Sequence, residues 1–236
     1  MNRALVCLPF AGGGAGFYRA WKDLPDGCPS IVAVQLPGRE ELFAEPMYKD
    51  AVTAAEELAP KIAEQVRGFD SYALFGHSLG AVLAFEVAGQ LARLDGRGPE
   101  HVFVSGSPGP WSGRSERATG LGDDEFVAKV EQFAGYRHDA LNEPELRELL
   151  LPLLRADVEM HENYRPQGRT PIAAPVTSLR GDADALVSAE QAREWAGATT
   201  GGFSYRELPG QHMYLVDAAD ALLAAVTATT AGRDGR

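Results

Sequence analysis

Short runs of apolar, β-prone residues recur along the chain, and most of them are continuous rather than alternating with polar residues. They cover residues 4–8, 31–36, 72–75, 101–105, 176–179 and 203–208. Continuous apolar runs are typical of strands that are buried on both faces of a parallel sheet. The pattern therefore predicts a largely parallel sheet.

Stretches with helical periodicity separate these runs. Residues 51–66 place an apolar face at helical spacing, with Pro60 expected to bend the helix, and residues 79–94 follow the third strand directly. Ser188 with Gln191 three residues later has the pattern of a capping box and predicts the start of a further helix. Alternation of strands and helices indicates a doubly wound α/β fold.

The order of these elements shows no internal repeat and no linker between separate halves. We therefore expect a single domain over residues 1–236. The last residues, 229–236, are expected to form a frayed tail.

The interval between residues 105 and 175 is far longer than a crossover helix requires. It contains apolar residues at helical spacing over 123–133 and again over 143–164, where Pro152 is expected to kink the helix. A helical insertion between two strands is typical of a lid over a site, so we predict a lid at about 107–173. The alternative is that these helices only add to the core.

Composition narrows the classes of function. The 236 residues are 45% hydrophobic, and 22 Lys and Arg against 33 Asp and Glu give a formal net charge of −11. This charge argues against binding to nucleic acid or to anionic lipid, and no apolar run is long enough to span a membrane. Cys7 and Cys28 fit neither a disulfide framework nor a zinc site. We expect a soluble cytoplasmic protein with no metal site.

Residues 76–80 read Gly-His-Ser-Leu-Gly, the Gly-x-Ser-x-Gly pattern of a nucleophile elbow. Such a pentapeptide is common by chance, but here it lies between a predicted strand and a predicted helix, as the elbow requires. The glycines remove side chains that would collide where strand and helix meet at the turn. We predict that Ser78 is a nucleophile; the alternative is an ordinary Gly-Ser turn.

A serine nucleophile needs a general base, and the chain has five histidines. His77 is adjacent to Ser78 and is expected to point elsewhere; three others, His101, His138 and His161, fall at a strand start or within the insertion. His212 follows the last predicted strand, at the edge of the sheet where α/β folds place their sites. We predict that His212 is the base.

The orienting acid is expected between the serine and the histidine in chain order. The loop after residues 101–105 has no carboxylate, whereas the loop after 176–179 has two, Asp182 and Asp184. We choose Asp184, because it lies further beyond the strand and can turn towards the histidine. Asp182 is the alternative, with a role limited to capping the turn.

A glycine-rich loop follows the first predicted strand, but it lacks the spacing of a phosphate-binding loop. In enzymes that place a serine nucleophile on such an elbow, the loop after an early strand supplies one N–H of the oxyanion hole, and the residue after the nucleophile supplies the other. We expect Leu79 to be one donor and either Phe10 or Ala11 to be the other.

Taken together, these motifs resemble the α/β-hydrolase superfamily and, more closely, the type II thioesterases that accompany polyketide and nonribosomal peptide synthases. The matching segments are 9–13, 35–40, 76–80, 180–184 and 210–215. The Pro-Gly-Arg sequence in the second segment is the most discriminating, because general esterases do not need it. There are two departures: Phe10 stands where many relatives carry histidine, which bears only on a supporting role at that position, and Met213-Tyr214 replaces the more usual aromatic pair, which is expected to alter packing rather than chemistry.

The resemblance implies hydrolysis of acyl groups from the phosphopantetheine arm of acyl or peptidyl carrier proteins, as an editing reaction. It implies no cofactor, a monomer, and a lid whose side chains line the acyl channel; we expect Phe126, Phe133 and Met213 to contact the substrate. A general carboxylesterase or lipase, an acyltransferase, and a binding module on the same fold are the alternatives.

Overall fold

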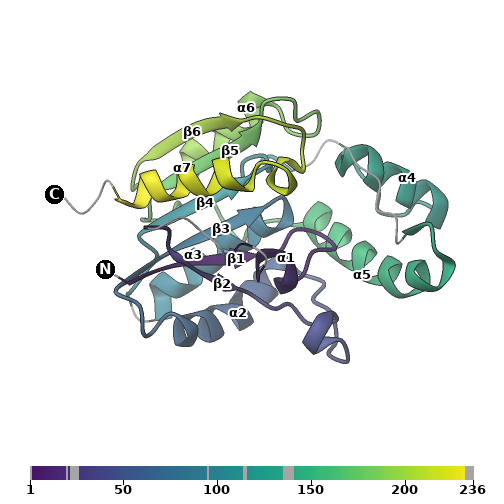
Figure 1. Cartoon of the computed structure of the whole chain (residues 1–236), viewed down its shortest axis with the longest axis horizontal. Coiled ribbons are helices and arrows are strands. Elements are labelled where there is room, and N and C mark those ends of the chain that lie inside the picture. Colours follow the sequence, from purple (N-terminus) through teal and green to yellow (C-terminus); the bar gives the residue numbers. More distant parts are fainter. Residues whose placement is uncertain are drawn as a thin grey trace.

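Six parallel strands form the centre of the molecule (Figure 1). A computed structural model describes residues 2–19, 21, 27–94, 96–113, 116–134 and 141–231. The strands are β1 (Arg3–Leu8), β2 (Ser30–Ala33), β3 (Ser71–His77), β4 (His101–Ser105), β5 (Val176–Gly181) and β6 (Phe203–Leu208). Their order in the sheet is β2-β1-β3-β4-β5-β6, and each pairs with its neighbours in parallel. The predicted parallel α/β fold is confirmed.

Helices connect the strands. They are α1 (Ala15–Arg19), α2 (Ala51–Gln65), α3 (Leu79–Leu94), α4 (Asp123–Ala134), α5 (Pro144–Asn163), α6 (Ala189–Arg193) and α7 (Ala219–Ala231), with short 3-10 turns η2 (Glu40–Leu42), η4 (Glu194–Ala198) and η5 (Tyr214–Val216). The predicted capping box is present: Ser188 Oγ accepts from the N–H of Gln191, and the Gln191 side chain accepts from the N–H of Ser188.

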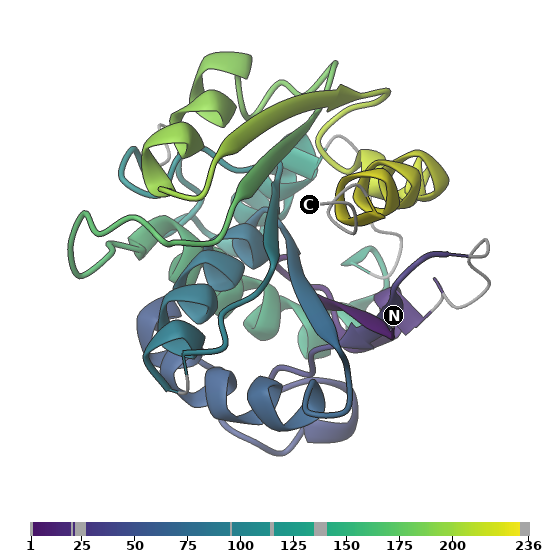
Figure 2. The ribbon, with the colours of Figure 1, turned by 90° about the vertical axis from the view of Figure 1, so that its left-hand side faces the viewer.

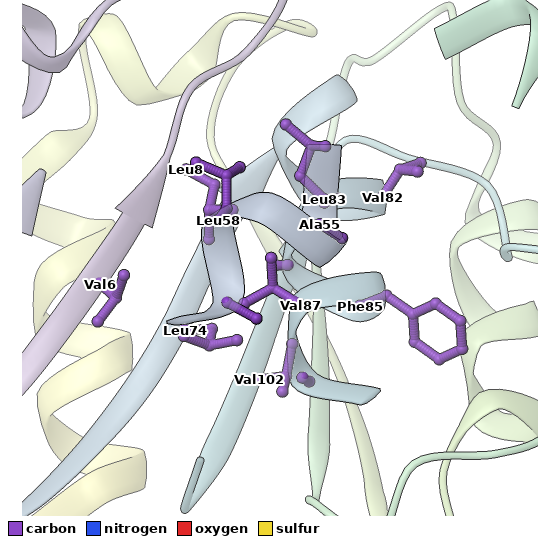
Figure 3. Close-up of a cluster of buried hydrophobic side chains, with 14 of the residues drawn as sticks. Val6, Leu8, Ala55, Leu58, Leu74, Val82, Leu83, Phe85, Val87 and Val102 are labelled. Carbon is purple, nitrogen blue, oxygen red and sulfur yellow. The ribbon is translucent and has the colours of Figure 1, made fainter. Parts of the chain in front are cut away.

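Alternate residues along the strands build two core layers, one on each face of the sheet. On one face, Val6, Leu8, Leu74 and Val102 pack against α2 and α3, as the close-up in Figure 3 shows. On the other face, Leu5, Cys7, Phe75 and Phe103 pack against Tyr18 of α1 and Leu222 and Val226 of α7. In Figure 2, α2 and α3, in blue, and α7, in yellow, lie on opposite sides of the sheet.

Two expected boundaries were wrong by three residues. Strand β2 ends at Ala33, although the apolar run continues to residue 36; Val34 and Leu36 are buried without being part of the strand. The expected tail begins too early, because residues 229–231 complete α7, and 232–236 lie outside the described residues. In α7 the hydroxyls of Thr227 and Thr229 donate to the carbonyls of the residues four positions earlier, which accommodates these β-branched polar residues in the helix.

The long interval between β4 and β5 contains α4 and α5, which lie together at one end of the molecule (Figure 1). Phe126 of α4 packs with Leu151 and Val158 of α5 in a small cluster of their own. Within the described part of the chain, none of the helices has the length and hydropathy that crossing a membrane requires.

Candidate active site

Ser78 lies at the sharp turn between β3 and α3. Its φ is 54°, in the left-handed region that non-glycine residues rarely adopt, and its N–H donates to Ser105 O at 2.8 Å. The two glycines leave room for this turn: a Cβ at Gly76 would lie 1.8 Å from Gly80 O, and one at Gly80 would lie 2.4 Å from Leu8 O. The turn thus has the strained geometry of a nucleophile elbow.

Alanine at Gly80 should therefore destabilise the protein by about 3 kcal/mol or more, because the added Cβ meets backbone that cannot move freely. In a domain of this size that corresponds to a fall in Tm of at least about 6 °C. The matched control is Gly89→Ala in the same helix, where a Cβ would have nothing within 4 Å. We expect that substitution to stabilise the helix by about 0.5–1 kcal/mol. Equal Tm values for the two variants in thermal denaturation would contradict this account of the elbow.

His212 and Asp184 form a hydrogen-bonded pair beside the elbow. His212 Nδ1 is 2.9 Å from Asp184 Oδ2, and both side chains are buried. The other carboxylate oxygen, Oδ1, accepts from the N–H groups of Leu186 at 2.8 Å and Val187 at 3.1 Å. The carboxylate is therefore held on both oxygens, and it orients the imidazole of His212.

Opposing effects act on the pKa of Asp184. Burial by itself would raise this pKa, but the hydrogen bond and charge of His212, with the N–H groups of Val187 and Leu186, outweigh it and hold the pKa below its usual value. Asp184 therefore stays ionised and can stabilise a positive charge on His212.

Asp182, the other candidate acid, contacts the backbone of the histidine loop instead of the imidazole. Its Oδ1 accepts from Gly210 N–H at 3.0 Å. Arg180 stabilises the loop that carries Asp184, because its guanidinium donates to the carbonyl oxygens of Asp184 at 2.8 Å and Val187 at 2.6 Å. The sequence contained Arg180 within a matching motif but did not reveal this contact.

His77 was expected to point away from the site. Instead, its ring packs against the ring of His212, with centroids 4.8 Å apart. Its Nδ1 lies 2.9 Å from Ser105 Oγ, which in turn lies 2.6 Å from the Tyr214 hydroxyl. All three are buried. This chain of polar groups supports the face of the His212 ring, and sequence reasoning missed it because the partners are far apart in the chain.

Two adjoining cavities open at the site. The smaller, of about 60 Å³, is lined by Phe10, Ala11, Ser78, Val130, Phe133, Leu154, Val158, Leu186, His212 and Met213. The larger, of about 400 Å³, shares five of these walls and continues along Gly12, Gly13, Gly14, Phe17, Glu131, Leu141, Leu150, Leu153 and Val216. Ser78 and His212 thus meet in one small chamber beside a mostly apolar cavity of the size that organic ligands occupy.

The two candidate oxyanion donors of the first loop, Phe10 and Ala11, line both cavities, and Leu79 is the first residue of α3. Helices leave their first N–H groups without partners inside the helix. Among the described residues, no backbone acceptor takes a hydrogen bond from the N–H of Phe10, Ala11 or Leu79. These N–H groups are therefore the candidate donors of an oxyanion hole.

Of the three expected substrate contacts, Phe133 and Met213 line the cavities, whereas Phe126 lines neither. Phe126 is fully buried within the cluster of α4 and α5, with the Arg155 guanidinium 4.2 Å above its ring. Its apolar side chain, which suggested a substrate contact, fills the space between these two helices instead.

Of the remaining histidines, His101 and His161 line neither cavity. His101 bonds to Thr177 across the sheet, with Nε2 2.7 Å from Oγ1, His161 is buried in α5, and His138 lies outside the described residues. In the described ranges, no three side chains of His, Cys, Asp or Glu are grouped as a metal site requires.

Comparisons with known proteins agree with this geometry. The family model described as "Thioesterase domain" matches residues 3–230. A probable cadicidin biosynthesis thioesterase of Streptomyces griseus is 37% identical over 220 residues, which are 92% of this chain but only 60% of that protein. The chain thus spans less than two thirds of the length of this relative.

Two solved structures are similar over most of their length. The RedJ thioesterase of the prodiginine pathway in Streptomyces coelicolor is 36% identical, with a TM-score of 0.84 over 96% of this chain and 85% of that one. The type II thioesterase BorB of the borrelidin cluster is 34% identical, with a TM-score of 0.82 over 96% and 91%. The resemblance to type II thioesterases of the α/β-hydrolase fold is confirmed, and the chain belongs to the thioesterase domain family.

Proposed function

We propose that this thioesterase removes acyl groups from the phosphopantetheine arm of acyl or peptidyl carrier proteins, as an editing enzyme of polyketide or nonribosomal peptide synthesis. The observation that carries the proposal is one chamber lined by Ser78 at a strained elbow and by His212, whose imidazole is oriented by Asp184. Membership of the thioesterase family and the similarity to biosynthetic type II thioesterases support the choice of substrate.

In the first half of the reaction, Ser78 attacks the thioester carbonyl. Because Asp184 accepts from Nδ1–H of His212, the lone pair of Nε2 is free to take the proton of the serine hydroxyl. The N–H groups of Leu79 and Ala11 are proposed to hold the oxyanion of the tetrahedral intermediate. Collapse breaks the carbon–sulfur bond, and the pantetheine sulfur leaves with the proton that His212 returns.

In the second half, water attacks the acyl-serine. His212 takes a proton from this water and returns it to the Ser78 oxygen as the ester bond breaks. The products are a free carboxylic acid and the regenerated serine. No cofactor enters either half-reaction.

The larger cavity is the proposed site of the acyl chain, because its walls are mostly apolar and it adjoins the chamber of Ser78. Leu150, Leu153 and Leu154 of α5 and Val130 of α4 form one side of it. We accordingly propose that the insertion at about 107–173 is a lid over the acyl site. Phe133 and Met213 line the chamber and would touch the acyl group nearest the thioester.

The function is tested with carrier proteins that are loaded with acyl groups of varied length. Mass spectrometry should show free acid and a deacylated carrier, with kcat/KM at least about tenfold above that for p-nitrophenyl esters of equal acyl length, because carrier and pantetheine add binding contacts. A preference for the oxygen ester would favour a general carboxylesterase instead. Acyl groups recovered on an added thiol acceptor, rather than as free acid, would identify an acyltransferase.

A further inference from the structure

The segment Pro-Gly-Arg-Glu at 37–40 has no place in the proposed chemistry, yet Arg39 contacts the loop after β1, and Glu40 contacts the first turn of α1, which follows that loop. Arg39 Nη1 donates to Gly13 O at 2.8 Å. The Glu40 carboxylate accepts from Gly16 N–H at 3.0 Å, and Glu40 has a φ of 48°, which is rare for a residue other than glycine. The segment thus holds the glycine-rich loop from one side.

Asp157 of α5 holds the same loop from the other side. Its carboxylate accepts two hydrogen bonds from Arg39, 2.7 Å from Nη1 to Oδ2 and 2.8 Å from Nη2 to Oδ1. A third hydrogen bond comes from Gly12 N–H, at 2.8 Å to Oδ2. Arg39 is 5% exposed and Asp157 is 1% exposed. Three distant parts of the chain therefore meet in one buried network.

Stability alone is a weak reason for such a network. Removing two charges from water offsets most of the attraction between them, and an apolar pair of similar volume is often as stable. A bidentate guanidinium–carboxylate pair does, however, fix both distance and orientation, which a lysine cannot reproduce. The geometry of this pair therefore points to positioning as its role.

The network ends beside the proposed oxyanion hole. Gly13 N–H donates back to the carbonyl oxygen of Phe10 at 2.9 Å, which closes a turn around Ala11. Asp157 and Arg39 bind the far side of this turn. Oxyanion donors contribute fully only when they are held within a fraction of an ångström of the productive position.

We propose that Arg39 and Asp157 are positioning residues for the oxyanion hole: they hold this turn so that the N–H of Ala11 faces the oxyanion while α5 is seated against Arg39. The inference rests on the proposed function, since it requires acyl transfer at Ser78. It also links the lid to the chemistry, because α5 lines the larger cavity through Leu153 and Leu154. The hole is complete only when the helix that meets the acyl chain is in place.

The test is Asp157→Asn, which keeps the shape of the side chain but removes its charge and places an amide NH₂ among donors. We expect kcat per active site, titrated with a fluorophosphonate, to fall about tenfold to a hundredfold while KM changes less than about threefold. The affinity for a trifluoromethyl ketone analogue of the acyl-pantetheine thioester, which forms a tetrahedral oxyanion with Ser78, should fall by the same factor as kcat/KM. If Asp157 had a purely structural role, the substitution would lower Tm and the number of titrated sites. It would leave kcat per active site and the affinity for the ketone analogue unchanged.

Glu162→Gln is the matched control. Glu162 lies on the same helix, is 2% exposed, and accepts from the N–H groups of Ala118 and Thr119 at 2.6 and 2.9 Å. It lines neither cavity. Its variant should lose thermal stability, as Asp157→Asn does, but keep kcat per active site within about twofold of the wild type.

Wild-type kcat and analogue affinity in Asp157→Asn would overturn the inference, as would an equal loss of kcat in Glu162→Gln. If Asp157→Asn does not fold, Arg39→Lys answers the same question, because a single ammonium nitrogen cannot reproduce the planar fork in which Nη1 and Nη2 bind the two carboxylate oxygens of Asp157. A wild-type enzyme without thioesterase activity would overturn the proposed function and this inference with it. An active wild type with an unaffected Asp157→Asn would overturn only the inference.

Discussion

Replacing Ser78 with alanine should lower kcat for thioester hydrolysis by about 10⁴-fold or more, because the acyl-enzyme can no longer form. The serine is 7% exposed and shares its chamber with His212, so a water molecule there lacks the fixed attack geometry of the Oγ atom. The backbone turn should survive, since alanine at φ 54° is strained only slightly more than serine. The measurement is release of free acid from an acyl-pantetheine substrate.

Ser178→Ala is the control for this substitution. Ser178 is another buried serine, 1% exposed, and it lies on β5 outside both cavities. This variant should keep its activity and its stoichiometric reaction with a fluorophosphonate, whereas Ser78→Ala should take no label. Labelled Ser78→Ala protein, or turnover close to that of the wild type, would place the nucleophile elsewhere.

Asp184→Asn should lower kcat by roughly 10³- to 10⁴-fold with little loss of fold. An asparagine amide facing Nδ1 favours the imidazole tautomer with the proton on Nε2, so the ring can no longer accept the serine proton. It also removes the charge that stabilises the imidazolium. Because the pKa of Asp184 is held below its usual value, this charge persists throughout the neutral and mildly acidic range and is lost only in strongly acidic solution. The variant should therefore be impaired at every pH at which the wild type is active, which a pH profile of kcat/KM measures.

Asp182→Asn separates the two candidate acids. The asparagine carbonyl can still accept from Gly210 N–H, so activity should fall less than about tenfold. A larger loss in Asp182→Asn than in Asp184→Asn would transfer the orienting role to Asp182.

The strands and the longer helices were largely predictable because their signals are local. Apolar, β-prone runs, most of them continuous, located all six strands, and α3 begins and ends where its periodicity indicates. The tract at 34–36 was misassigned because burial, and not strand pairing, explains its apolar residues. Helix α7 was missed because its threonines are poor helix formers whose hydroxyls find carbonyl partners only once the helix exists.

In the candidate site, too, the residues with a local sequence signal were predictable and those that depend on distant contacts were not. Ser78 and His212 could be proposed from short motifs next to strand ends, where a parallel sheet gathers its loops. The choice of Asp184 over Asp182 depended on how a loop turns, which only coordinates display. Asp157 gave no local signal, since its partner Arg39 is 118 residues away. Conversely, Phe126 has the apolar side chain expected of a substrate contact, but the packing of α4 on α5 buries it between these two helices.

All of α4 and α5 comes from one uninterrupted stretch of chain, while Ser78, Asp184 and His212 lie on loops outside it. On the proposed assignment, a pathway can acquire an enzyme for a new acyl chain by exchanging this stretch as a cassette without altering the reacting groups. The ion pair sets one condition on such a transplant. A donor cassette must bring an acid to face Arg39, or the recipient must lose that arginine at the same time, because a guanidinium buried opposite an apolar helix would be left without a counter-charge.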